Sequence, residues 1–251
     1  MIPDKFSLSQ DWLEIQRSVQ NSSTPWDKKI NKVIWRGSFT DVGKTFHHAD
    51  FSLDASIRLK LCQLSQKHSE WLDAAFTNAK PAHLLKLLEI GQTLKPFLNK
   101  RELLKCKYLP VLDGHMCTYP GYQWSLLSNS IALKQESDQV QWFYRALQPY
   151  VHYIPIRQDL SDFVEKVEWA KKNDEKMKKI AENATKFAQN NLLLADNYLY
   201  LYLLFNAYAG YQKIDFASCK KNMASQGWVC IQYQRNMQFK KSIKKRFPQL
   251  F

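Results

Sequence analysis

The sequence has few glycines and no regular spacing of cysteines. Its seven glycines include neither a GxGxxG fingerprint nor a Walker loop, so two common phosphate-binding motifs are excluded. Its five cysteines include no CxxC pair, which argues against a disulfide framework and against a zinc site. No HExxH pattern is present either. We therefore expect no metal centre and no bound cofactor.

A signal segment and a long apolar run are also lacking. The N-terminus, "MIPDKFSLSQDW", has no basic segment followed by an apolar core, so no secretory signal is predicted. The most apolar stretch, 192–211, is interrupted by Asp196, Asn197 and Asn206, which favours a buried core helix over a membrane span. We expect a cytoplasmic protein, with a peripheral position at the inner membrane as a further option.

Acidic residues are outnumbered, with 23 Asp and Glu against 36 Lys and Arg, a formal net charge of +13. Such a balance favours an anionic partner, which is a nucleic acid, an anionic membrane or a phosphorylated small molecule. The C-terminal segment, ending "RNMQFKKSIKKRFPQLF", predicts an amphipathic basic helix over 238–246. Because no nucleic-acid-binding motif accompanies it, we expect no nucleic-acid partner.

Short apolar runs alternate with helical periods along the chain. Runs at 32–35, 108–112, 130–134 and 151–156 are typical of strands. Periods typical of helices lie at 84–90, 160–170 and 177–188. This alternation predicts an α/β fold with a mostly parallel sheet and helices on both faces.

Ligands of such sheets bind outside the carboxyl ends of the strands. The first strand leads into Arg36, Gly37 and Ser38, and the second leads into the loop 113–119, followed by a helix predicted around 122–127. A guanidinium, a glycine and a hydroxyl would suit a phosphate or a sugar. The plainer interpretation is a strand exit in which Arg36 pairs with a carboxylate, with Lys44 as a solvated lysine. His152, in an apolar run, is interpreted as a hydrogen-bonded core histidine.

Five segments, in this order, resemble the CAP10-like glycosyltransferases, glycosyltransferase family 90. This family includes bacterial lipopolysaccharide core enzymes called LpsA and animal protein O-glucosyl- and xylosyltransferases. The resemblance covers about residues 2–211 and is carried by "IWRGS", "KYLPVLDG", "LLSNSIALKQESD", "WFYRALQPYVHYIPI" and "DLSDFVEKVEWAKKNDEKMKKIAENATKFA".

The resemblance implies a GT-B-type fold with a Rossmann-like domain that binds a nucleotide sugar, without a metal. It implies three parts: a remnant of an N-terminal domain or linker at 1–31, the nucleotide-sugar domain at 32–211, and a basic extension at 212–251. The N-terminal domain is expected to be truncated. The nucleotide-sugar site carried over by the resemblance consists of Arg36, Ser38, Lys44, His115, Met116, Cys117, Thr118 and Tyr119.

The function implied is transfer of a sugar, from a donor expected to be UDP-linked, to a surface-glycan or lipid-linked acceptor such as lipopolysaccharide core. Neither Asp113 nor Asp41 matches the family's general base, so no base is assigned. Two alternatives stay open. One is a nucleotide-sugar-binding remnant, or half of a split enzyme, without activity of its own. The other is a protein that binds nucleic acid or an anionic membrane through its basic tail.

Overall fold

The structure is a computed structural model that describes residues 3, 5, 7–40, 56–114 and 116–211, without the side chains of Ala82 and Lys86. It divides into two compact units, one ending at Leu193 and one beginning at Leu194. Each unit is described by itself. The boundaries predicted at 31/32 and 211/212 stay predictions.

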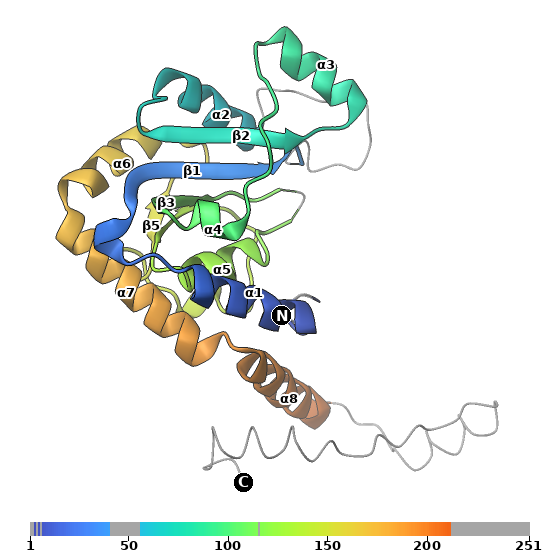
Figure 1. The fold of residues 1–251 in the computed structure, drawn as a ribbon. Helices are drawn as coiled ribbons and strands as arrows, with labels where there is room; N and C mark the ends of the chain where they lie inside the picture. Colours follow the sequence, from blue (N-terminus) through green and yellow to red (C-terminus); the bar gives the residue numbers. More distant parts are fainter. Residues whose placement is uncertain (1–2, 4, 6, 41–55, 115, 212–251) are drawn as a thin grey trace, which may run out of the picture. The chain divides into compact units, whose positions relative to one another are not determined.

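The first unit is built on a five-stranded sheet with the order β2-β1-β3-β4-β5, and every strand pairs parallel to its neighbour (Figure 1). The α/β fold with a parallel sheet is thereby confirmed. The strands are β1 (Ile30–Ser38), β2 (Leu72–Asn78), β3 (Cys106–Val111), β4 (Ile131–Gln135) and β5 (Ile154–Ile156).

Four of these strands coincide with the predicted runs, and β2 is the strand that the sequence pattern did not predict. Its sequence, LDAAFTN, has two alanines and an aspartate, which are depleted in strands. Its alanines Ala74 and Ala75 are nevertheless buried. Pairing with β1 therefore overrides a weak local preference.

The helices predicted from periodicity are also present, and α2 begins at a capped residue. The Ser56 side chain accepts a hydrogen bond from the Leu59 backbone nitrogen, as expected of an N-cap. The helices of the first unit are α1 (Gln10–Ser22), η1 (Trp26–Lys28), α2 (Ile57–Lys67), α3 (Pro81–Glu89), α4 (Lys100–Leu103), α5 (Gly121–Leu126), η3 (Tyr144–Ala146), α6 (Phe163–Lys172) and α7 (Asp174–Asn191).

The core joins the sheet to the helices that follow its strands. Val33 of β1, Leu59 of α2, Phe163 of α6 and Met177 of α7 belong to one buried cluster. α5 contacts β3, β4 and α7, and α1 contacts α4 and α5. Burial of these apolar side chains is the main force that holds the helices to the sheet.

The strand order creates a switch point between β1 and β3. The chain passes from β1 outward to β2, then returns to the other side of β1 to form β3. The connections that leave the carboxyl ends of β1 and β3 therefore diverge, which leaves a crevice where sheets of this order bind ligands. The sequence had placed its two candidate loops at these same strand ends.

The second unit is described as far as Tyr211 and consists of α8 (Leu194–Tyr211). Tyr202, Leu203, Phe205, Tyr208 and Tyr211 are exposed along it, so the prediction of a buried core helix for this stretch was wrong. The buried residues of this helix are the polar Asp196 and Asn197, so the apolar character of the stretch did not predict its burial. None of the described helices combines the length and apolar character needed to cross a membrane.

Candidate functional site at the carboxyl ends of β1 and β3

The exit of β1 is shaped by a close approach of Gly37 to Trp35. A Cβ on Gly37 would lie 2.4 Å from the Trp35 ring, so a larger residue would displace that ring. The register of β1 against β2 shifts between Gly37 and Ser38. Ser38 is partly buried, and within the described residues its hydroxyl makes no hydrogen bond, which leaves the hydroxyl available to a ligand.

Arg36 faces β2. Its Nη2 lies 2.8 Å from Asp73 Oδ2, and its Nη1 donates to the Trp35 and Asp73 carbonyl oxygens. Lys95 Nζ lies 2.8 Å from the other Asp73 oxygen. Burial acts to raise the Asp73 pKa, but hydrogen bonds from Arg36 and Lys95 outweigh it and lower the pKa to about 2. Arg36 therefore pairs with a carboxylate, as expected if the end of β1 is an ordinary strand exit.

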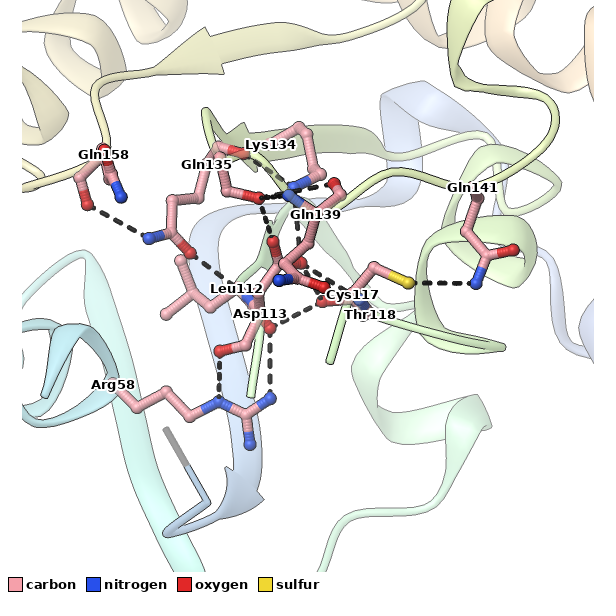
Figure 2. Close-up of polar contacts among 11 residues, drawn as sticks. Arg58, Leu112, Asp113, Cys117, Thr118, Lys134, Gln135, Gln139, Gln141 and Gln158 are labelled. Atoms are coloured by element: carbon pink, nitrogen blue, oxygen red, sulfur yellow. Dashed lines mark hydrogen bonds and ion pairs between the residues drawn. The ribbon is translucent and has the colours of Figure 1, made fainter. Parts of the chain in front are cut away.

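The exit of β3 is organised around the buried carboxylate of Asp113 (Figure 2). Its Oδ1 accepts hydrogen bonds from the Thr118 backbone nitrogen at 3.0 Å and the Thr118 hydroxyl at 3.2 Å. Its Oδ2 accepts a hydrogen bond from Ser137. Lys134 Nζ lies 3.4 Å from Oδ1. Asp113 thus ties its own loop to the end of β4, which is a structural role.

Lys134 is the buried cation of this network. It donates to the Gln135 carbonyl at 2.6 Å and lies over the Tyr144 ring. Burial lowers the pKa of Lys134, and the Asp113 charge opposes that shift. Together these contacts fix one end of the loop that follows β3.

Arg58, in the first turn of α2, connects the two strand exits. Its Nη1 donates to the Ser38 carbonyl at 2.8 Å and to the Thr40 hydroxyl at 2.6 Å. Its Nη2 donates to the Leu112 carbonyl at 3.1 Å and its Nε donates to the Asp113 carbonyl at 3.0 Å (Figure 2). A planar guanidinium with five donors is suited to such a junction, and it places a permanent positive charge at the crevice.

Sequence reasoning missed Arg58. A signal was present, since Ser56 is a good N-cap and Ile57, Leu61 and Leu64 follow at helical spacing. Gly114 is also required here, because a Cβ on it would lie 2.6 Å from Thr40 Oγ1 and 2.8 Å from Arg58 Nη2.

A cavity of about 140 Å³ opens between the two exits. Its lining includes Trp35, Gly37, Arg58, Thr118 and Trp124. Sites that hold whole ligands usually measure ~300–1,000 Å³. This cavity is therefore large enough for a part of a nucleotide sugar, and its lining includes the Arg58 cation but not Ser38.

The residues predicted from the resemblance are distributed unequally around this cavity. Cys117 is buried, and its sulfur accepts a hydrogen bond from Gln141 at 3.1 Å. Thr118 lines the cavity, whereas Met116 is exposed and its sulfur accepts a long hydrogen bond from the Tyr119 hydroxyl. Lys44, His115 and Asp41 lie outside the described residues.

In the described part of the chain, neither metal ligands nor histidines form a second centre. Within the described residues no group of three His, Cys, Asp or Glu side chains is placed to hold a metal ion. The His152 Nδ1 accepts a hydrogen bond from the Gln148 backbone at 3.0 Å, and burial lowers its pKa. The hydrogen bond expected of His152 is therefore present, but the residue is only partly buried, so the core position expected for it was wrong.

Comparison with known proteins gives a consistent result. The family model described as Glycosyl transferase family 90 matches residues 8–250. Protein O-glucosyltransferase 2 of Danio rerio is 36% identical over 200 residues, 78% of this chain and 36% of that protein. Protein O-glucosyltransferase 3 of Homo sapiens is 33% identical over 212 residues, 81% of this chain and 38% of that protein.

Among solved structures, Anabaena Alr3699/HepE in complex with UDP-glucose matches with a TM-score of 0.46 and 14% identity. The match covers 81% of this chain and 53% of that one. The chain spans little more than a third of the length of the two O-glucosyltransferases that it matches.

Proposed function

The chain belongs to glycosyl transferase family 90, and from that premise we propose that it forms the donor-binding part of a glycosyltransferase that uses a UDP-linked sugar. The observation that carries the proposal is the junction at Arg58. This side chain joins the exits of β1 and β3 beside a cavity, at the switch point where such sheets bind ligands.

The chemistry of donor cleavage fits this junction. When the sugar leaves, negative charge develops on the diphosphate, and fixed cations and hydrogen-bond donors stabilise it. Arg58 supplies a fixed cation in the lining of the cavity. The Ser38 hydroxyl, at the end of β1, is our proposed hydrogen-bond donor to the diphosphate. Lys44 and the loop 115–119 complete the site by the family resemblance.

The acceptor is proposed to be a hydroxyl group, in one of two settings. The first is a surface glycan such as lipopolysaccharide core, for which the excess of basic residues is suitable because phosphorylated glycans are anionic. The second is a protein side chain, which the names of the two O-glucosyltransferase relatives favour. For the first setting we propose a cytoplasmic location, peripheral to the inner membrane.

Donor binding is tested by thermal unfolding with UDP, GDP and CMP sugars. A ligand at 100 times its dissociation constant stabilises the folded state by about 2.7 kcal/mol. We expect this stabilisation from UDP sugars alone, and we expect it to be weaker in Ser38→Ala. It should be unchanged in Ser23→Ala, which replaces an exposed serine at the C-terminal end of α1. Equal stabilisation of the wild type and both variants would show that Ser38 does not contribute to the site. If no nucleotide sugar stabilises the wild type, the proposal is contradicted.

Transfer is tested separately with radiolabelled donor. The purified chain is incubated with a lipopolysaccharide core acceptor and, in parallel, with a folded protein acceptor rich in serine. Label in one acceptor identifies the setting. Donor binding without label in either acceptor, and without donor hydrolysis, would favour the binding-only alternative.

A further inference from the structure

A second cavity, of about 340 Å³, lies at the outer edge of β2. Its lining includes Lys32 of β1, Asp73 of β2, Ser65 of α2, and Gln92 and Lys95 from the connection after α3. None of its lining residues lines the cavity at Arg58. It is therefore a separate site on the same domain.

The charge of this cavity is positive. Lys32 and Arg36 alternate along β1 and so share a face of the sheet with each other. Asp73 carries the negative charge on that face, and both Arg36 and Lys95 pair with it. Lys32 has no carboxylate partner within the described residues. In the lining of this cavity, two cations, Lys32 and Lys95, therefore accompany one carboxylate, while Arg36 lines the cavity at Arg58.

Gln92 supplies an unused donor in the same cavity. Its side chain is buried, with 6% of the residue exposed, and its amide nitrogen has no hydrogen-bond partner among the described residues. The backbone of Gln92 is held by a 2.8 Å hydrogen bond to the Leu87 carbonyl. A buried donor without a partner destabilises the folded state, and a ligand oxygen that accepts its hydrogen bond would remove that cost.

We propose that this cavity is a binding site for a phosphate group, either on a phosphorylated sugar or as free inorganic phosphate. Lys32 and the Gln92 amide donate to the phosphate oxygens, and Lys95 contributes its charge. Asp73 accepts a hydrogen bond from a hydroxyl group of an attached sugar. The volume suits a monosaccharide phosphate, which lies near the lower limit of ~300 Å³ for ligand sites.

The site does not depend on the proposed transfer reaction. A phosphate site away from the donor crevice would hold an anionic glycan, or would respond to phosphate concentration, whichever sugar the crevice uses. The two proposals can therefore fail independently.

The test is a titration followed by the NMR signals of the Gln92 side-chain amide, assigned through Gln92→Leu, and of the Thr93 backbone amide. The probes are inorganic phosphate, glucose 6-phosphate and glucose, each added with and without saturating UDP. We expect both phosphates to shift these signals with UDP present, and glucose to leave them unchanged. Tighter binding of glucose 6-phosphate would identify a sugar phosphate, and equal binding would identify free phosphate.

Variants make the test specific. Lys32→Gln should raise the dissociation constant about tenfold, as expected for loss of a charged hydrogen bond, while Lys32→Arg should retain most of the affinity. Lys28→Gln, an exposed lysine on η1, is the matched control and should bind like the wild type. Absent shifts at millimolar phosphate, or equal weakening in Lys32→Gln and Lys28→Gln, would overturn the proposal. Stabilisation by UDP is expected to be the same in all of these variants.

Discussion

A buried or partly buried cation joins neighbouring segments at each end of the sheet, and the two ends differ in what lies beside that cation. At the amino ends, Lys29 Nζ donates to the Leu104 carbonyl at 2.6 Å and to the Ser130 hydroxyl at 2.8 Å. At the carboxyl ends, Arg58 donates to the exits of β1 and β3 and also lines a cavity. We call the amino ends the closed end, because Lys29 is held there between backbone and hydroxyl groups. We call the carboxyl ends the open end, because Arg58 borders a cavity there.

The chemistry of the two cations matches this difference. Burial lowers the pKa of Lys29 to about 8, so Lys29 loses its charge at a lower pH than an exposed lysine does. The guanidinium of Arg58 is always protonated, so the open end keeps its charge at any pH at which the protein folds. A diphosphate would therefore find a permanent cation at the carboxyl ends.

The largest effect is expected from Arg58→Met. The four hydrogen bonds described above are lost, and the Ser38, Leu112 and Asp113 carbonyls lose a partner. We expect the free energy of unfolding to fall by about 3–5 kcal/mol in denaturant titrations, with loss of stabilisation by UDP sugars. Arg17→Met, at an exposed arginine of α1, should change neither quantity. A loss below about 1 kcal/mol would contradict the described junction.

Asp113→Asn should have the next largest effect. Lys134 would be left buried without its carboxylate, and such unpaired charges cost several kcal/mol. Because the pair is 3.4 Å apart, we expect about 2 kcal/mol of destabilisation by urea titration. Asp138→Asn removes an exposed carboxylate nearby and serves as the control. Equal stability of the two variants would show that Asp113 does not fix the loop.

Gly114→Ala should follow, at about 1–3 kcal/mol, because the new methyl group would overlap Thr40 and Arg58. It should also weaken donor binding, since either the loop or Arg58 must move. Gly210→Ala in α8 is the matched control, because a Cβ there meets nothing within 4 Å. If Gly114→Ala binds UDP sugars as the wild type does, the short distance from Gly114 to Thr40 and Arg58 is not needed for donor binding.

The last effect is a dependence on pH at the closed end, and it is small for each single pH unit. The folded pKa of Lys29 lies below the ordinary value of 10.5, so between pH 8 and 10.5 the unfolded chain holds more protons. The free energy of unfolding of the wild type, relative to Lys29→Met, should rise by about 1 kcal/mol per pH unit in that window. A flat or falling difference would show that Lys29 keeps an ordinary pKa when folded.

Much of the fold followed from local patterns, whereas the site depended on contacts between distant segments. The apolar runs that became β1, β3, β4 and β5 were readable because their residues suit strands. Ser38 and Thr118 were placed at the correct sheet edge by the rule for parallel strands.

The remainder could not be read from the sequence for physical reasons. Lys134 and Ser137 meet Asp113 only because β3 and β4 are neighbours in the sheet, a pairing that no local signal encodes. Arg58 is separated from Ser38 by 20 residues, and its role depends on where α2 begins. The Ala-rich β2 is a strand because β1 pairs with it.

The central claim, that the carboxyl ends of β1 and β3 form the ligand-binding end of the sheet, is tested most directly by hydrogen exchange with and without UDP-glucose. We predict slower exchange of backbone amides in 35–40 and 111–119 when the ligand is present, and unchanged exchange in 104–107 and 129–131 at the closed end. Protection at the closed end, or none at either end under conditions where UDP-glucose is bound, would contradict the account.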